Sequence, residues 1–513
     1  MLSKIYSAGL FGIDGYIVTA ECNGLRRLPR FSLVGLPDLA VKEAQERVRT
    51  ACENSGFKFP SLDLMINLAP ADRKKEGSGF DVAILLGILR SAGYLNPEVD
   101  LSKKCFVGEL SLSGQLRSVR GALCMCTAAR DAGFEEFYLP AENAAEAAAV
   151  SGIKVYGVPD MVALVNHLNG ASKIEPTAFD EKGFFADRGP RVLDFSDVRG
   201  QHLAKRAMEI AAAGGHNILL IGPPGTGKSM LAKRMPSILP PLTFEEAIET
   251  TKIHSVSGVL PDGVSLLSVR PFRSPHHTMS AVSLVGGGIN PRPGEISLSH
   301  NGVLFLDELP EFPKAVTDSL RQPLEDKRVT ITRASGRVTY PCSFMLVAAM
   351  NPCRCGYFGD STHKCTCRPD EVRKYISKIS GPLLDRIDIQ IELPAISYDD
   401  LSGSQPDGES SAEIRKRVIA AREVARKRMS GEGKIFCNAQ LDSATLRKYC
   451  KMDAEAHELL RAAYESMGLS ARGYDRTVRV ARTIADLDGS ENISAAHIAE
   501  AIQLRSLDRK YWS

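Results

Sequence analysis

The chain has 513 residues, with 64 lysines and arginines against 61 aspartates and glutamates and a formal net charge of +3. At about 150 residues per domain, this length predicts two to four domains. The apolar content of 44% and the charged content of 24% exclude a disordered or fibrous chain, and the near balance of charge leaves any nucleic-acid contact to local patches.

Export and membrane insertion are not expected from this sequence. The longest apolar stretch runs from Val82 to Leu89, which is too short to cross a bilayer, and the amino terminus does not resemble a signal peptide. In such a chain the twelve cysteines are more often buried thiols or metal ligands than disulfides. We therefore expect a cytoplasmic protein with no membrane partner.

Residues 1–170 alternate short β-type runs with helical stretches. The β-type runs include "GYIVTA", "LDLMINLAP", "CFVGEL" and "EFYLP", and the clearest helical pattern is "DLAVKEAQERVRTACENSG". This alternation predicts a self-contained α/β domain. Residues 171–190 show no sustained periodicity and are interpreted as a linker.

Residues 191–395 contain three apolar strand patterns, "NILLIG", "GVLFLDE" and "FMLVAAMN", separated by helices, which predicts a parallel sheet. A polar connector at 397–413 follows, and the rest of the chain has helical periodicity. The expected fold class is α/β, with a P-loop core at 191–395, a Cys-rich insert at 351–370 and a helical lid at 396–513.

The run "GPPGTGKS" has the spacing of a phosphate-binding loop and lies between a strand and a helix. Its glycines let backbone amides approach phosphate oxygens, while Lys228 reaches the terminal phosphates and Ser229 coordinates Mg²⁺. An empty Gly-rich turn is the alternative interpretation. The residues expected to bind ATP are Gly222, Pro223, Pro224, Gly225, Thr226, Gly227, Lys228, Ser229 and Met230.

The run "VLFLDE" delivers two carboxylates from a buried strand. Asp307 is expected to bind Mg²⁺ and Glu308 to polarise the attacking water, which favours hydrolysis over transfer to an acceptor hydroxyl. The alternative is that both side chains only cap the strand. The third strand, expected between the other two, ends in Asn351, whose amide is suited to orient the water or the γ-phosphate.

Arg386, in "GPLLDRIDI", has the character of an arginine finger supplied to a neighbouring subunit. That role would make the protein active only as a ring. An ion pair with Asp385 or Asp388 of the same chain is the alternative.

Together these motifs resemble an AAA+ ATPase. The runs "GGGINPRPGEISLSHNGVLFLDELPEFPKAVTDSLRQPLEDKRVTITRASG", "AAMNPCRCG" and "SGPLLDRIDI" resemble the magnesium-chelatase-like bacterial family known as YifB or ComM. The likeness extends over nearly the whole chain, from "GLFGIDGYIVTAE" to "LSARGYDRTVRVARTIADL". It implies a hexameric helicase that uses ATP and Mg²⁺, drives branch migration in recombination during natural transformation, and has single-stranded or branched DNA and recombination proteins as partners.

The same resemblance implies two hairpins that project toward a central channel, near "SLVGGGINPRPGEISLS" and "RVTITRASGRVTY". Arg292, Arg333 and Arg337 are then expected to contact DNA phosphates, or else to be exposed arginines that keep the hairpins soluble. The lid arginine that senses nucleotide would be Arg472, with Arg476 as the second choice.

Residues 1–170 also resemble the Lon-type protease fold, through "VGELSLSGQLRSVRGAL". Ser78 is displaced by one position, Gly79 occupies the nucleophile's place, and Leu123 stands where the activating lysine belongs, which argues against proteolysis. Assembly is one expected role for this domain. Binding of DNA or a partner through the basic runs "GLRRLPR" and "PADRKKEG" is another, although such runs are commonly solvated surfaces.

The run "NPCRCGYFGDSTHKCTCRPD" carries two cysteine pairs and His363. Two such pairs joined by a turn can close a tetrahedral zinc site, but their C-x-C spacing leaves reduced thiols or a redox pair as alternatives. Arg354 replaces a proline that is usual in the family, and we hypothesise that its charge points toward DNA. The four candidate zinc ligands are Cys353, Cys355, Cys365 and Cys367.

The run "RKRVIAAREVARKR" (415–428) predicts a basic helix whose apolar side includes Ile414, Val418, Ala421 and Ala425. A solvated lid face is favoured over a helix that tracks a phosphate backbone. The rival function for the whole chain is a chelatase-like or protein-remodelling motor that acts on a partner protein. A scaffold with a nucleotide switch is disfavoured because Glu308 is intact.

Overall fold

The computed structural model describes residues 2–186, 193–261, 263–288, 291–333, 336–360, 363–395, 408–432, 437–505, 507 and 511. The chain divides into two compact units. The first comprises Met1–Arg188 and Thr243–Ser268, and the second comprises Gly189–Leu242 and Val269–Ser513. A segment from the middle of the chain therefore packs with the amino-terminal residues.

The described part of the first unit is built on a seven-stranded mixed sheet of order β3-β4-β2-β1-β5-β8-β9. Strands β1, β2 and β4 pair antiparallel, and the other neighbours pair parallel. The strands are β1 (Leu2–Phe11), β2 (Asp14–Leu25), β3 (Arg30–Val34), β4 (Asp63–Ala69), β5 (Lys104–Phe106), β8 (Glu136–Pro140) and β9 (Lys154–Val158), with a small ribbon of β6 (Glu109–Leu110) and β7 (Leu116–Arg117) beside them.

Helices cover this sheet, and the first, α1, lies within the run 38–56 whose periodicity predicted a helix. Helix α1 is capped by Asp38, whose carboxylate accepts from the Val41 amide, and it buries Val48 and Ala51 in the core. The predicted linker contains a short helix, α6, and its residues 187–190 lie outside the described residues. The helices of this unit are α1 (Leu39–Asn54), α2 (Asp81–Ser91), α3 (Ala122–Asp131), α4 (Ala144–Ala147), α5 (Met161–Leu168), α6 (Glu181–Ala186) and α9 (Phe244–Ser257).

Helix α9 belongs to the first unit although it follows the P-loop in the chain. It begins with a capping box in which Thr243 and Glu246 exchange side-chain and backbone hydrogen bonds. Near its end, Ser255 Oγ donates to the buried Glu146 carboxylate (2.5 Å) and accepts from the Gly121 amide (2.9 Å). These polar contacts attach α9 to helix α3 and its neighbours.

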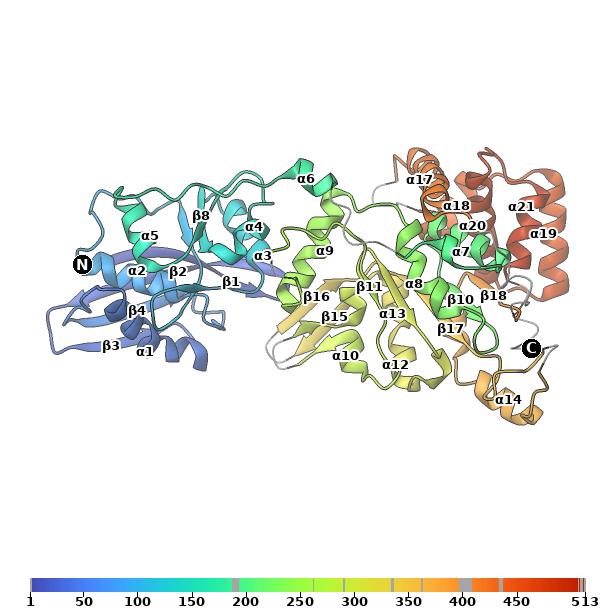
Figure 1. The fold of residues 1–513 in the computed structure, drawn as a ribbon, viewed down its shortest axis with the longest axis horizontal. Coiled ribbons are helices and arrows are strands. Elements are labelled where there is room, and N and C mark those ends of the chain that lie inside the picture. The colour runs from blue at the N-terminus through green and yellow to red at the C-terminus, as the bar shows by residue number, and fades with distance from the viewer. Residues whose placement is uncertain are drawn as a thin grey trace. The chain divides into compact units, whose positions relative to one another are not determined.

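The second unit contains a parallel sheet of order β11-β14-β17-β10-β18, which has five strands within the described residues (Figure 1). Its three central strands, β14, β17 and β10, are short and wholly apolar, as expected of a sheet buried on both faces. Strand β17 pairs with both β10 and β14, so its predicted place between them is confirmed. The strands are β10 (Ile218–Ile221), β11 (Phe272–Arg273), β14 (Val303–Leu306), β17 (Met345–Met350) and β18 (Ile389–Glu392).

Short helices and two hairpins accompany this sheet. The hairpins are β12 (Gly286–Gly287) with β13 (Arg292–Pro293), and β15 (Arg328–Arg333) with β16 (Gly336–Pro341). The helices of the core are α7 (His202–Gly214), α8 (Lys228–Ile238), α10 (Ala281–Val285), α11 (Glu295–Leu298), α12 (Lys314–Ser319), α13 (Arg321–Asp326), α14 (Pro369–Ile376) and α15 (Gly381–Leu384).

The carboxyl-terminal part is helical, as predicted, and its helices lie together in Figure 1. One buried apolar cluster joins them to the sheet, because it includes Ile218 and Val347 as well as Val418 and Ile484. Most of the connector predicted at 397–413 lies outside the described residues. The lid helices are α17 (Ser411–Arg428), α18 (Ser443–Tyr449), α19 (Ala454–Met467), α20 (Ala471–Leu487) and α21 (Ala495–Gln503).

Helix α17 buries Ile414, Val418, Ala421 and Ala425, which confirms its predicted apolar side. Across the described ranges, no helix has both the length and the apolar character that a bilayer span demands.

Candidate functional site

The loop between β10 and α8 holds Lys228 at the first turn of a helix. Gly225 and Gly227 have φ of +82° and +86°, a conformation that glycine adopts without strain. The Lys228 ammonium donates to the carbonyl oxygens of Gly222 (2.7 Å) and Pro223 (2.8 Å) and lies 3.2 Å from Asn351 Oδ1. The loop therefore curls around its own lysine beside the end of β17.

The carboxyl ends of the parallel strands bring the next residues to the same edge. Asp307 follows β14, and its Oδ2 accepts a hydrogen bond from Ser229 Oγ at 2.6 Å. Glu308 comes next, with φ of +53° and a side chain that is 54% exposed. The hydroxyl and carboxylate expected to share Mg²⁺ are thus in direct contact, and Glu308 extends from the same strand end toward solvent.

The environment of Lys228 changes its acidity. Burial lowers the pKa of Lys228 to about 8, while the charges of Asp307 and Glu308 act in the opposite direction. An anionic phosphate beside the ammonium would add to the effect of these carboxylates. The arrangement suits a ligand that carries several negative charges.

His277 is a neighbour of this site that sequence reasoning missed. Its Nδ1 lies 3.5 Å from Glu308 Oε2, and its ring packs edge-on to Phe312 with a centroid distance of 6.3 Å. The pair "HH" after β11 was the available signal, but nothing local to it indicates that β11 and β14 are neighbours. The histidine gives the carboxylate expected to activate water an imidazole neighbour.

Arg386 lies at the opposite end of the parallel strands from the P-loop. Strands β10 and β18 run parallel with Ile218 beside Ile389, so the three residues before β18 lie where the strands begin and the P-loop lies where they end. Four residues of strand span about 13 Å. Arg386 is therefore not beside the Lys228 of its own chain.

Arg386 forms an ion pair within its own chain, but its partner is neither Asp385 nor Asp388. Its Nη2 forms an ion pair with Glu325 Oε1 at 2.5 Å, and Nη1 donates to the Pro382 carbonyl at 2.6 Å. The expected partners Asp385 and Asp388 were chosen because they are near in sequence, whereas Glu325 is contributed by α13. The Nε of Arg386 is buried without a hydrogen-bond partner in the described part of the chain.

Arg472 and Arg476 also lie away from the P-loop. Arg476 is buried, and its Nε lies 3.4 Å from Asp388 Oδ1, just before β18. Arg472 is exposed one helical turn earlier, at the start of α20. The arginine-finger and sensor candidates thus lie near the edge of the sheet where the parallel strands begin. Lys228, Ser229, Asp307 and Asn351 lie at the other edge, where the strands end.

Asp388 joins the sheet to the lid. Burial alone would raise its pKa, but the hydrogen bond with His216 and the charges of Arg476 and Arg479 hold the pKa of Asp388 at about 2. The other nitrogen of His216 lies 2.8 Å from Thr483 Oγ1 on α20. This buried network fixes the lid against the core.

A cavity of about 420 Å³ adjoins the P-loop on one side. Pro223 lines it from the loop, Leu203 from α7, Leu393 from the chain after β18 and Gln503 from α21. Phe358 of the Cys-rich insert also lines it. A partly apolar cavity of this size beside a phosphate loop suits a nucleotide base.

The two hairpins pack against each other. Tyr340 Oη donates to the Pro291 carbonyl at 2.7 Å, and a Cβ on Gly286 would lie only 3.0 Å from Ile331 Cδ1. Both hairpins therefore belong to one surface feature, which we call the hairpin pair (286–288, 291–293, 328–333 and 336–341).

The three arginines expected to contact DNA lie on the hairpin pair. Arg292 pairs with Gly287, and the Arg333 guanidinium approaches within 3.3 Å of where a Gly287 Cβ would lie. Arg337 pairs with Thr332, next to Arg333, and all three arginines are exposed. Ala334 and Ser335, which stand between Arg333 and Gly336 in the chain, lie outside the described residues.

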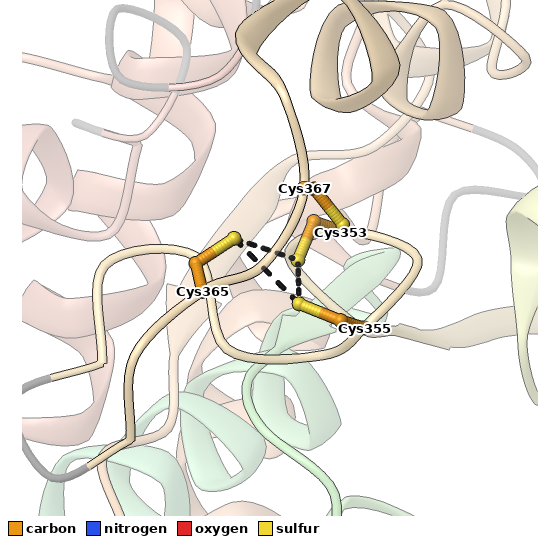
Figure 2. A group of neighbouring side chains, drawn as sticks. All are labelled: Cys353, Cys355, Cys365 and Cys367. Atoms are coloured by element: carbon orange, nitrogen blue, oxygen red, sulfur yellow. Dashed lines mark hydrogen bonds between the residues drawn. The ribbon is translucent and has the colours of Figure 1, made fainter.

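The four predicted cysteines converge, as Figure 2 shows. The sulfur of Cys353 lies 3.3 Å from that of Cys355 and 3.7 Å from that of Cys365, and Cys355 and Cys365 are 3.6 Å apart. With Cys367, all four sulfurs lie within 4.8 Å of one another, close enough to hold one metal ion. Zn–S bonds of 2.3 Å in a tetrahedron place sulfurs about 3.8 Å apart.

In the first unit, Ser78 donates a hydrogen bond to the Glu109 carboxylate. Leu123 is buried in α3 at the position where a Lon-type lysine would lie. Lys75, three residues before Ser78, is buried with its ammonium on the carbonyl oxygens of Arg73 (2.9 Å) and Pro70. A carboxylate is a poor base for a serine hydroxyl, so this arrangement offers no activated nucleophile.

A P-loop strand and an Asp-Glu strand separated by a third strand, with a helical lid behind, define the AAA+ class. Three family models match: "Magnesium chelatase, subunit ChlI" at 194–401, "Subunit ChlI of Mg-chelatase" at 20–143, and "Magnesium chelatase, subunit ChlI C-terminal" at 408–505. Together they span both units.

Full-length relatives are also similar. The chain is 43% identical over 511 residues to competence protein ComM of Haemophilus influenzae, covering 99% of this chain and 98% of the relative. It is 42% identical to the YifB proteins of Escherichia coli and Salmonella typhimurium, with the same coverage. The chain belongs to the YifB/ComM family of magnesium-chelatase-like AAA+ proteins.

Proposed function

We propose that this chain is an ATP-driven ring motor that acts on DNA and promotes branch migration during recombination. The observation that carries the proposal is that one compact unit combines the convergent Lys228, Ser229, Asp307 and Asn351 with an exposed, arginine-bearing hairpin pair. A relative of 43% identity is named a competence protein, which directs the proposal toward DNA.

In this proposal the P-loop residues bind ATP. Lys228 leaves the carbonyl oxygens of its own loop for the terminal phosphates, and Ser229 and Asp307 hold Mg²⁺ between them. Glu308 orients and polarises the water, and Asn351 positions it against the γ-phosphate. The cavity beside Pro223 receives the base.

Arg386 acts on the nucleotide of a neighbouring subunit, and Arg472 senses nucleotide from the lid. Arg386 lies at the edge of the sheet where the strands begin, and this position supports its role in a neighbouring subunit, because an arginine there is remote from the P-loop of its own chain. A closed assembly of identical subunits, which we propose to be a hexamer, would bring that edge against the next P-loop.

The hairpin pair contacts the phosphates of single-stranded or branched DNA through Arg292, Arg333 and Arg337. The basic helix α17 is a weaker candidate. Arg415 donates to the Ser237 carbonyl, Arg422 to the Ala212 carbonyl, and Arg417 pairs with Glu209. These contacts engage its arginines within the unit, which supports the lid-face interpretation.

The four-cysteine cluster holds a structural Zn²⁺, since four thiolates at these separations suit tetrahedral zinc. Arg354 is exposed within this segment and adds positive charge beside it. We propose that this charge faces DNA. If Arg354→Ala leaves the DNA-stimulated ATPase rate unchanged, this part of the proposal fails.

The test of the proposed function is the ATPase rate of the purified protein with and without single-stranded and forked DNA, with Glu308→Gln as the blank. We expect DNA to raise the rate several-fold and the variant to be inactive. A rate that Glu308→Gln abolishes but DNA leaves unchanged would instead favour the chelatase-like or protein-remodelling motor.

A further inference from the structure

The Cys-rich insert is connected to the nucleotide site at three places. The first connection is the chain itself, which runs directly from the site into the insert. Cys353 lies two residues after Asn351, whose Oδ1 is 3.2 Å from the Lys228 ammonium. Cys353 is fully buried, while the other three cysteines are half-buried. Whatever fixes the Cys353 sulfur therefore also fixes the chain immediately after β17.

The second contact is between the turn at Gly356 and the ring of Pro224 in the P-loop. Gly356 has φ of +90°, and a Cβ built there would lie 2.6 Å from Cδ and 2.9 Å from Cγ of Pro224. No side chain fits in that space. The turn of the insert is therefore seated directly on the P-loop.

The third contact is at the cavity. Phe358 and Asp360 of the insert line it together with Pro223 of the P-loop. The Phe358 ring also lies 6.4 Å from the ring of Tyr511, whose hydroxyl donates to Glu392 at the end of β18. One wall of the proposed base pocket thus belongs to the insert.

The insert has little else to hold its shape. From 351 to 368, the described residues form neither helix nor strand, and those fully buried are Pro352, Cys353 and Gly356. A loop with so small an apolar core folds stably only when it is cross-linked or binds a metal.

We propose that zinc bound by these four cysteines clasps the nucleotide site: it holds Gly356 on the P-loop and Phe358 at the cavity, so that ATP binding depends on the metal. This inference rests on the proposed structural zinc and deepens it. The metal is not placed to touch ATP. It acts through the shape of the loop.

The first measurement is zinc content and the affinity for a fluorescent ATP analogue in the full-length protein without DNA. We expect one zinc per chain. Removal of zinc with a chelator should weaken analogue binding by about tenfold, and adding zinc back should restore it. Because the polypeptide is unchanged, this comparison does not depend on a variant that folds.

The second measurement uses variants. Cys365→Ala with Cys367→Ala should lose zinc and weaken analogue binding to the same extent as chelation. His363→Ala is the matched control, since this exposed histidine lies between the pairs outside the four-sulfur set, and it should retain both zinc and affinity. Gly356→Ala should keep zinc but weaken binding, because its Cβ meets Pro224.

The outcomes separate the two claims. Protein that contains no zinc would overturn both the structural metal and the clasp. Zinc that is present but can be removed without a change in analogue affinity would overturn the clasp and leave the metal. Neither result depends on whether DNA stimulates hydrolysis, so failure of the DNA motor would be seen separately.

Discussion

Lys228 and Glu308 occupy different surroundings at the same sheet edge, and their substitutions should therefore have different effects. Lys228 is buried against the loop carbonyls, whereas Glu308 is exposed beside the Ser229–Asp307 pair. Lys228→Ala should weaken binding of an ATP analogue more than tenfold, because an ammonium aimed at phosphate is removed. Equilibrium titration with a fluorescent analogue measures this.

Glu308→Gln should bind the analogue as tightly as the unchanged protein but hydrolyse ATP about 10²-fold to 10⁴-fold more slowly, since it loses only the base. Steady-state ATPase assays provide the comparison. Equal losses of binding in both variants would show that Glu308 holds nucleotide rather than activates water.

Asp388 should contribute to stability in a pH-dependent way. Its folded pKa of about 2 is below the value of about 3.9 for an unfolded chain, so its contribution is present above pH 4 and is lost as the pH falls from 4 toward 2. The shift corresponds to about 2 to 3 kcal/mol. Urea unfolding at pH 7 should show Asp388→Asn destabilised by at least about this amount.

Two comparisons test whether the charge of Asp388 stabilises the folded protein. Asp370→Asn, in an ion pair whose side chains are at least 80% exposed, should leave the urea midpoint unchanged. The difference between Asp388→Asn and the unchanged protein should narrow below pH 4. If the difference stays constant down to pH 3, the charge of Asp388 is not the source of its stability.

At the scale of single residues, the sequence predicted correctly those site residues whose positions depend on the adjacent strand or loop. The P-loop glycines, Ser229 and Asp307 lie at strand ends, and parallel strands bring their carboxyl ends together. The Arg386–Glu325 pair and the His277–Glu308 contact join residues about 60 and 30 positions apart, and no periodicity indicates which loops meet.

The hairpin pair is the element that separates the DNA proposal from its rival. Arg333→Ala with Arg337→Ala should weaken binding to single-stranded DNA by about tenfold and reduce the slope of log affinity against log salt by up to about 2, because two phosphate contacts are lost. Fluorescence anisotropy at several salt concentrations measures both. The ATPase rate without DNA should not change.

Arg328→Ala is the matched control for the hairpin. Arg328 is exposed on the same strand but pairs with Pro341 at the base, away from the tip. It should leave DNA affinity and salt slope unchanged. Equal effects of tip and base substitutions would mean that the arginines contribute only general charge.

Helices α17 and α9 show what sequence predicts about an element and what it does not. The apolar spacing of α17 correctly assigned its buried side, but the carbonyl partners of Arg415 and Arg422 come from other helices and could not be foreseen. Helix α9 lies between motifs of the ATPase core, so chain order alone gave no reason to place it with the first unit. Its attachment depends on the tertiary contacts of Ser255 and Glu146.

At the scale of the whole molecule, the proposed ring makes each site depend on two chains. Lys228→Ala and Arg386→Ala should each lower the ATPase rate about a thousandfold when purified alone. Mixing the two variants should restore part of the rate, because some interfaces then combine an intact Lys228 with an intact Arg386. Recovery in a mixing series measures this directly.

Glu325→Gln tests whether Arg386 matters only through its ion pair. It should retain most of the ATPase rate if Arg386 acts on a neighbour's nucleotide. A loss as large as that of Arg386→Ala, together with no recovery on mixing, would place the function of Arg386 within its own chain.

The most direct test of the central claim is migration of a synthetic four-way DNA junction, followed by separation of the products on a gel. We predict that the unchanged protein converts the junction only with ATP and Mg²⁺, that Glu308→Gln does not, and that the Arg333/Arg337 variant is slowed. An enzyme that hydrolyses ATP at full rate with DNA bound, yet leaves the junction in place, would contradict the account.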